Sequence, residues 1–350
     1  MRVLMTGHRG FIGQVMAPLF RDAGHEVVGL DSEIFRGASF AAGESDFPEI
    51  ELDIRDVERG HLEGFDALVH LAALSNDGLS NLDADVTRSI NETASLRVAQ
   101  CAKDAGITRF LFSSSCSIYG KAGDDLVDED GKIETITPYT MFKANVEREL
   151  AKLADDQFSP TYLRNATAYG VSPCASHELV LNNLVAWAHA EGYVLIKSDG
   201  TPWRPTVHVE DIALAFLEAL TAPREAIHNE AFNVGTTEEN YSVSELAGIV
   251  SEVVPGSRIE YAEGGKPDVR SYKVDFGKIR RALPNFRPRW TVWQGAEQLY
   301  QACREADLSV EAFEGPEYKR AEFIKSQIAS GAMATSLRWT TDRIEVNGHD

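Results

Sequence analysis

Cysteine is scarce in this 350-residue sequence, and its four copies lie far apart. Cys101, Cys116, Cys174 and Cys303 form no C-x-x-C pair and no spacing typical of a zinc site. The sequence therefore argues against a disulfide framework, predicts no metal site, and favours a reducing compartment.

Basic charge and long hydrophobic runs are also lacking. The chain has 34 Lys and Arg against 54 Asp and Glu, a formal net charge of −20, which argues against a general affinity for nucleic acid or anionic membrane. No apolar run reaches the length of a membrane span, and MRVLMTG at the start has no basic stretch followed by an apolar region. We expect a cytoplasmic protein with neither nucleic acid nor membrane as a partner. If the ligand is itself an anion, its binding site must contain arginines that offset the negative charge of the rest of the protein.

What the first half does contain is an alternation of short apolar runs with amphipathic stretches, which is typical of βαβ units around a parallel sheet. The predicted strands cover residues 2–7, 25–31, 66–73, 109–115 and 160–166. Helical patterns over 11–24 and 90–106 each end on a glycine, the residue that most often stops a helix. The pattern predicts an α/β fold with a Rossmann-type, doubly wound parallel sheet.

The first predicted strand leads into TGHRGFIG, which places Gly7, Gly10 and Gly13 three apart at a strand-to-helix turn. Glycines there let backbone N–H groups approach a pyrophosphate, whose charge the helix N-terminus stabilises. Such turns also occur for structural reasons alone. Asp31 strengthens the functional reading, because an acid at the end of the second strand accepts hydrogen bonds from the adenosine ribose and repels a 2′-phosphate. We therefore predict binding of NAD.

Regular alternation loosens after about residue 170. We assign residues 1–170, with about 206–235, to an NAD-binding Rossmann domain. Residues 171–205 and 236–310 are assigned to a smaller α/β substrate domain, and 311–350 to a C-terminal extension that has some helical pattern but no usable motif.

Two further segments could contact the dinucleotide. Asp53 in LDIRD could reach the adenine amino group, although a solvated acid in a turn is the alternative. Ala72 and Ala73 end a predicted strand and leave room for a bound cofactor, although tight core packing also explains small residues there.

The stretch TPYTMFK, residues 137–143, pairs a phenol with an amine. Thr137 can cap a helix, Pro138 suits its first position, and Tyr139 and Lys143 then lie at i and i+4 on one face. The pair is either an incidental surface contact or a phenol held ready to release its proton. SSSCSIYG, residues 113–120, follows a predicted strand at the sheet edge where ligands bind, although a plain polar loop is the alternative.

Taken together, GHRGFIG, Asp31, DIRD, HLAA, SSSCSIYG and YTMFK resemble the extended short-chain dehydrogenase/reductase family, in its NAD-dependent nucleotide-sugar epimerase/dehydratase branch, over roughly residues 1–300. The resemblance implies that Tyr139 is the catalytic acid/base, Lys143 its activator and a ribose ligand, and Ser115 the hydroxyl that holds the reacting oxygen. It also implies a nucleotide-diphosphate sugar as substrate, linked to UDP, dTDP, CDP or GDP, and a homodimer.

The resemblance assigns the remaining contacts as well. Arg204 in RPTVHVEDIA and Arg270 in PDVRSYKVD match arginines that hold the sugar nucleotide's diphosphate, a role suited to bidentate guanidinium groups; without the family, each reads as a surface arginine. The sequence adds Asn76 and Trp203 as pocket candidates. The cofactor set is Gly7, Arg9, Gly10, Phe11, Ile12, Gly13, Asp31, Asp53, Ile54, Leu71, Ala72, Ala73, Asn91, Ser113, Tyr139 and Lys143. The substrate set is Ser75, Ser115, Ser117, Asn165, Thr167, Asn183, Arg204 and Arg270.

Two positions depart from the family pattern. Cys116 and Ser117 stand where the dehydratase subgroup has an Asp-Glu pair, which disfavours 4,6-dehydration unless the Cys116 thiolate acts as a base. Thr167 replaces the usual Asn before Tyr-Gly, with Asn165 two residues earlier.

The preferred prediction is an NAD-dependent epimerase that acts through a transient 4-keto sugar. Asp31 favours it, because the acid selects NAD, which an epimerase retains. The alternatives are an NAD(P)H-dependent 4-keto reductase, a 4,6-dehydratase, and a non-catalytic NAD-binding regulatory protein, against which the complete Ser115, Tyr139 and Lys143 set argues.

Overall fold

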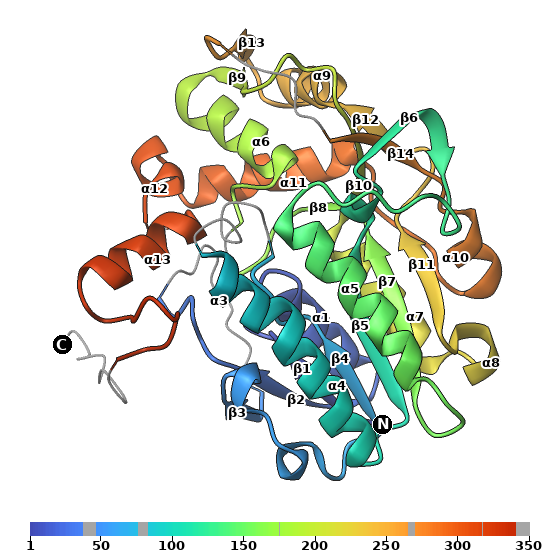
Figure 1. Cartoon of the computed structure of the whole chain (residues 1–350). Helices are drawn as coiled ribbons and strands as arrows, with labels where there is room; N and C mark the ends of the chain where they lie inside the picture. The colour runs from blue at the N-terminus through green and yellow to red at the C-terminus, as the bar shows by residue number, and fades with distance from the viewer. Residues whose placement is uncertain (38–46, 76–82, 175, 265–269, 317, 341–350) are drawn as a thin grey trace.

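A seven-stranded parallel sheet forms one of two lobes (Figure 1). The computed structural model describes residues 1–37, 47–75, 83–174, 176–264, 270–316 and 318–340. The strands are β1 (Arg2–Thr6), β2 (Glu26–Asp31), β3 (Glu49–Glu51), β4 (Ala67–His70), β5 (Arg109–Ser115), β7 (Ser159–Asn165) and β11 (Glu230–Val234). Their spatial order, β11-β7-β5-β4-β1-β2-β3, changes direction between β1 and β4, the place where such folds bind ligands. The predicted doubly wound sheet is confirmed.

Helices cover both faces of this sheet (Figure 1). Alternate strand residues point to opposite faces, so Met5 packs in one core with α1 (Gly13–Asp22) and α7 (Val209–Thr221). Its neighbour Leu4 packs in a second core with α4 (Ser95–Asp104) and α5 (Pro138–Leu153). The residues of β1 are therefore buried on both faces of the strand, as a sheet between two helix layers requires.

Local signals set the helix ends as the sequence predicts. Gly24 and Gly106 follow α1 and α4 with φ of +87° and +85°, a left-handed conformation that glycine adopts without strain. At the start of α5, the Thr137 hydroxyl accepts a hydrogen bond from the Thr140 N–H, and Pro138 occupies the first turn. Tyr139 is thereby fixed at the N-terminal end of a rigid helix.

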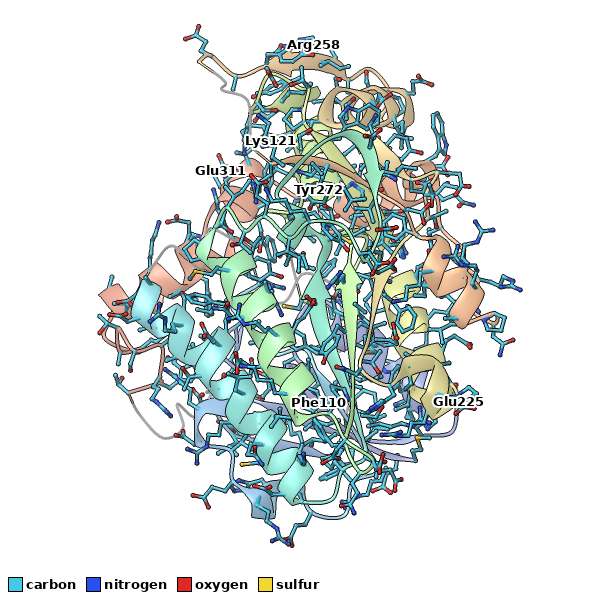
Figure 2. The ribbon with its side chains drawn as sticks, turned by 45° about the vertical axis from the view of Figure 1, so that its right-hand side comes forward. Phe110, Lys121, Glu225, Arg258, Tyr272 and Glu311 are labelled. Atoms are coloured by element: carbon cyan, nitrogen blue, oxygen red, sulfur yellow. The ribbon has the colours of Figure 1, made fainter. Side chains whose placement is uncertain are left out.

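The second lobe contains smaller sheets and a separate apolar core. Leu184, Val250 and Leu299 meet there from three helices. Figure 2 shows Phe110 within the sheet lobe and Tyr272 higher up, where the lobes meet. The strands are β8 (Thr167–Tyr169), β10 (Trp203–His208) and β12 (Asn240–Ser242) in one sheet, β9 (Tyr193–Ile196) with β13 (Arg258–Tyr261), and β6 (Lys121–Val127) with β14 (Ser271–Val274). The helices are α6 (Val180–Glu191), α9 (Val243–Val253) and α11 (Val292–Glu305), whereas α10 (Gly277–Ala282) packs against β11 of the sheet lobe.

Shorter elements complete the chain: α3 (Ala84–Arg88), α8 (Arg224–Ile227), α12 (Val310–Glu314) and α13 (Arg320–Ala329), with a π-helical turn over Ser89–Ala94 and 3₁₀ turns over Ile54–Asp56, Arg59–Leu62 and Cys116–Tyr119. Within the described part of the chain, no helix has the length and hydrophobicity that a membrane crossing needs.

Candidate active site

A cavity of about 1000 Å³ lies along the carboxyl edge of the sheet and under the second lobe. That volume is at the upper end of the range for small-molecule sites. Its wall comes from the segments after β1, β2, β3, β4, β5 and β7 and from parts of the second lobe. Almost every residue predicted for the cofactor or the substrate is part of this wall.

The glycine turn after β1 is shaped for close approach. Gly7 has φ of +74°, and a Cβ atom placed on it would lie 2.6 Å from the backbone nitrogen of Ala72. A Cβ on Gly13 would lie 2.5 Å from the Gly7 carbonyl oxygen. Both distances are too short for a real side chain, so only glycine fits. The turn and the N-terminus of α1 form a backbone cradle that fits the diphosphate of NAD.

Asp31 ends β2 and faces the same cavity. Its carboxylate accepts hydrogen bonds from the backbone N–H groups of Arg9, at 3.1 Å, and Glu33, at 2.9 Å. Burial raises the pKa of Asp31, while the Glu33 N–H and the nearby His8 act in the opposite direction. The carboxylate is thus held in one orientation at the predicted position of the adenosine ribose.

Asp53 and Ile54 also line the cavity, next to Arg55. Asp53 caps the 3₁₀ turn by accepting from the Arg55 N–H at 2.8 Å, and it forms an ion pair with the Arg55 guanidinium at 2.5 Å. Both oxygens of this carboxylate therefore already interact with Arg55. If Asp53 also contacts the adenine, its carboxylate must interact with the adenine and with Arg55 at the same time.

The segment after β4 contributes Leu71, Ala72 and Ala73 to the wall. Asn91 does not reach the cavity; it is buried, accepts from the Leu74 N–H at 2.8 Å and donates to the Leu74 carbonyl at 3.0 Å. Both hydrogen bonds of the Asn91 carboxamide go to the backbone of Leu74, so Asn91 fixes the position of the segment after β4 without contacting the cavity.

Ser115, Tyr139 and Lys143 lie on the wall of the same cavity. Lys143 Nζ donates to the Ser113 carbonyl at 2.5 Å and lies 5.8 Å from the centroid of the Tyr139 ring. Burial lowers the pKa of Lys143 to about 8. The Ser115 hydroxyl lies 2.8 Å from that of Ser117. A phenol, an amine and a hydroxyl thus line the same cavity as the glycine turn.

The substrate end is assembled from distant segments. Arg204 donates to the carbonyls of Trp203, at 2.8 Å, and Arg270, at 2.5 Å, which holds the two arginine segments together. Asn183 donates to the His177 carbonyl at 3.0 Å. Ser75, Ser115, Ser117, Asn165, Thr167, Asn183, Arg204 and Arg270 all line the cavity. Trp203 is not part of its wall, and Asn76 lies outside the described residues.

Asn165 ends β7 opposite Ser115 of β5. Its amide group donates to the Ser113 hydroxyl at 3.0 Å, and its buried carboxamide oxygen has no hydrogen-bond partner among the described residues. A buried acceptor of this kind at a cavity wall is suited to a ligand hydroxyl.

The alternative that the Cys116 thiolate acts as a base is wrong. The side chain is fully buried in the core, away from the cavity wall, and its Sγ lies 3.0 Å from the Arg164 carbonyl. Burial raises the pKa of this thiol well above its ordinary value. Neither position of the dehydratase acid pair therefore presents an acid or base to the cavity.

Several residues of the wall carried no signal in the sequence. They are Phe35, Cys174, Glu178 and Tyr272, and, from the C-terminal extension, Lys319, Arg320, Ala321 and Leu337. Tyr272 belongs to the PDVRSYKVD segment and Phe35 to the loop after Asp31, whereas the packing of remote segments brings the C-terminal residues to the cavity.

Comparisons with known proteins agree with this geometry. The model of the NAD dependent epimerase/dehydratase family matches residues 3–235. The low-salt glycan biosynthesis protein Agl12 of Haloferax volcanii is 30% identical over 307 residues, covering 85% of this chain and 96% of that protein. A UDP-glucose 4-epimerase of Corynebacterium glutamicum is 28% identical over 268 residues, covering 72% and 80%.

Among solved structures, MoeE5 in complex with UDP-glucuronic acid and NAD is similar, with a TM-score of 0.76 and 26% identity over 87% of this chain and all of that one. The family match spans β1 to β11 and includes the glycine turn, Asp31, Ser115, Tyr139 and Lys143. The chain is a member of the NAD-dependent epimerase/dehydratase family, an enzyme whose cofactor is NAD.

Proposed function

We propose that this enzyme is a nucleotide-sugar epimerase that acts through a transient 4-keto sugar. The observation that carries the proposal is the placement of Ser115, Tyr139 and Lys143 on one cavity wall with the glycine turn, while positions 116 and 117 present no acid. Relatives named UDP-glucose 4-epimerase and UDP-glucuronate 4-epimerase support the reaction class.

Tyr139 is the proposed proton acceptor. Its position at the start of α5 places the phenol at the cavity, and the buried Lys143 one turn later provides a positive charge that stabilises the phenolate. The phenolate takes the proton from the hydroxyl at C4 of the sugar and returns it when the hydroxyl re-forms. Ser115 donates a hydrogen bond to the same oxygen. Bound NAD supplies the acceptance and return of a hydride at that carbon.

Inversion requires the keto sugar to present its other face to the cofactor. The sugar must therefore rotate while the nucleotide stays in place. Arg204 and Arg270 are proposed to hold the diphosphate that serves as the fixed point, because guanidinium groups bind phosphate oxygens in pairs. The nucleotide is proposed to be uridine, since MoeE5 was solved with UDP-glucose and with UDP-glucuronic acid.

Elimination of water requires a second acid and base near the sugar. In the described part of the chain, the carboxylates of the cavity wall are Asp31, Glu33, Asp53 and Glu178. The first three lie at the glycine-turn end, and Glu178 pairs with Arg320 at 3.8 Å. The reacting end around Ser115 and Tyr139 thus favours simple oxidation and reduction at C4 over 4,6-dehydration.

The test is turnover of a panel of UDP- and dTDP-hexoses and UDP-glucuronic acid by the purified protein, with no added cofactor. The expected product has the mass of its substrate and an inverted centre, detected by chromatography and NMR. A strict need for stoichiometric NADH would identify a 4-keto reductase instead, and a product lighter by one water would identify a dehydratase.

A further inference from the structure

The C-terminal segment, residues 318–340, returns to the sheet lobe, and Figure 1 shows α13 at its margin. Phe323 of α13 packs against Phe35, with ring centroids 6.3 Å apart. Ile324 is fully buried in the core that contains Ile54 and Leu74. This segment lies beyond the residues that the family model matches, yet it is part of the Rossmann core.

Hydrogen bonds fasten the end of this segment to the loops after β2 and β3. The Arg55 guanidinium donates to the Ser336 carbonyl at 2.7 Å, and the Trp339 indole donates to the Glu33 carbonyl at 3.3 Å. Arg338 Nη2 donates to Asp56 at 2.9 Å. These loops begin with Asp31 and Asp53, and Leu337 lies between the fastening points on the cavity wall. Leu337 therefore belongs to the adenosine end of the cavity.

Arg320, the first residue of α13, places a guanidinium in the same wall. It is only 6% exposed, its Nη1 lies 3.4 Å from the Ser75 hydroxyl, and its Nη2 lies 3.3 Å from Cys174 Sγ. Glu178 is its ion-pair partner at 3.8 Å. Burial of a guanidinium is costly unless anionic groups surround it.

One further contact links the neighbours of Arg320 to the glycine turn. The Ser172 hydroxyl donates to the Phe11 carbonyl at 2.8 Å, which ties the loop that carries Cys174 and Glu178 to the glycine turn. Arg320 contacts that loop through Cys174 and Glu178. Its guanidinium lies over the Phe35 ring, 5.1 Å from the centroid, and close enough to Asp31 for the two charges to influence each other, so it lines the same cavity as the cradle that fits a diphosphate.

We propose that Arg320 binds the diphosphate of NAD and that Leu337 covers its adenosine, so that residues 318–340 retain the cofactor. A guanidinium offers a planar fork of donors that matches phosphate oxygens, while the glycine turn offers backbone donors. The dinucleotide is then enclosed by two parts of the chain that are about 300 residues apart in sequence. The proposal rests on NAD binding and not on the epimerase reaction.

The test follows exchange of the bound cofactor without any sugar. Purified holoenzyme is mixed with excess radiolabelled NAD, and the half-time for uptake of label is measured after rapid gel filtration. Arg320→Gln should shorten the half-time by about tenfold or more, the loss expected for one charge-assisted hydrogen bond. Arg320→Lys should fall between that variant and the wild type, because it keeps the charge but loses the fork.

Lys325→Gln is the matched control, since Lys325 also belongs to α13 but is 55% exposed and pairs with Glu322. It should exchange NAD like the wild type. Leu337→Ala is an independent arm at the adenosine end and should speed exchange a few-fold. If Arg320→Gln folds poorly, Arg320→Lys and Leu337→Ala decide the question.

Wild-type exchange in both Arg320→Lys and Leu337→Ala, or in a folded Arg320→Gln, overturns the proposal. A purely structural role for Arg320 would lower the melting temperature and leave the exchange half-time unchanged, which also counts against it. Because no sugar is present, these outcomes are independent of whether the enzyme proves to be an epimerase.

Discussion

The glycine-turn end and the sugar end of the cavity are constructed differently. Backbone shape dominates the first, where Gly7 and Gly13 leave no space for a Cβ atom and Asp31 is oriented by two N–H groups. Side chains from remote segments dominate the second, where Arg204 and Arg270 meet through a carbonyl hydrogen bond. The contrast predicts that the diphosphate cradle follows from a short local motif, whereas the shape of the sugar end depends on how the second lobe packs.

The largest effect should come from Tyr139→Phe, which removes the phenol and keeps the ring. Turnover should fall by about 10³-fold or more, because general acid–base catalysis is lost, while the NAD content of the purified protein stays the same. The measurement is kcat together with bound NAD after acid extraction. A variant with normal kcat would remove Tyr139 from its proposed role, and loss of NAD would show that the two ends are not separable.

Lys143 lies where the two ends meet, and Lys143→Met tests what its burial does to stability. The folded-state pKa of about 8 is below the ordinary value of 10.5, so between these values the unfolded chain binds more protons and the stability contribution of Lys143 rises with pH. At pH 7 the buried charge is destabilising. At pH 7, the unfolding free energy of Lys143→Met should therefore exceed that of the wild type by on the order of 1–3 kcal/mol, despite the low activity of the variant. Urea unfolding measures this difference.

The same measurement at pH 10 provides the control for Lys143→Met. There the wild-type side chain is mostly neutral in the folded state, so the advantage of the variant should shrink. An equal difference in unfolding free energy at both pH values would show that packing, and not charge, separates the two proteins.

Arg204→Gln should separate the sugar end from the cofactor end. We expect KM for the nucleotide sugar to rise by about 10- to 100-fold with little change in kcat, because a diphosphate contact stabilises substrate and transition state alike. NAD exchange should stay as in the wild type. Arg258→Gln is the control, since Arg258 is 69% exposed on β13 at the far edge of the second lobe (Figure 2). Equal KM values for both variants would contradict the assignment.

The smallest effect is expected at Asp31. Asp31→Ala removes the carboxylate that would repel a 2′-phosphate, so the preference for NAD over NADP should fall by about tenfold. Asp31→Asn keeps the acceptor for the Glu33 N–H but loses the one for the Arg9 N–H, so it should show the same loss of preference with less disturbance of the turn than Asp31→Ala. Competition between NAD and NADP measures the ratio of their affinities. A ratio unchanged from the wild type in both variants would be evidence against the contact between Asp31 and the ribose.

Much of this site could be predicted because its residues follow strands and helices that local sequence patterns reveal. Apolar runs identified the strands, Gly24 and Gly106 marked helix ends, and the Thr137–Pro138 pair placed Tyr139 at the start of α5. Parallel strands bring their carboxyl ends to one edge, so residues that follow them in sequence become neighbours in space. Even so, Asn91 was expected at the cofactor and instead supports the wall through the backbone of Leu74.

Local patterns predicted the strands of the sheet lobe, the glycine turn and the helix that carries Tyr139 and Lys143, because each pattern involves residues a few positions apart. Tertiary packing, by contrast, buries Cys116 in the core and brings Arg320 to the cavity. Those outcomes depend on which distant surfaces pack together, and no local pattern records that choice. Burial is a property of the whole molecule, because it removes surface that two separate segments must cover for each other.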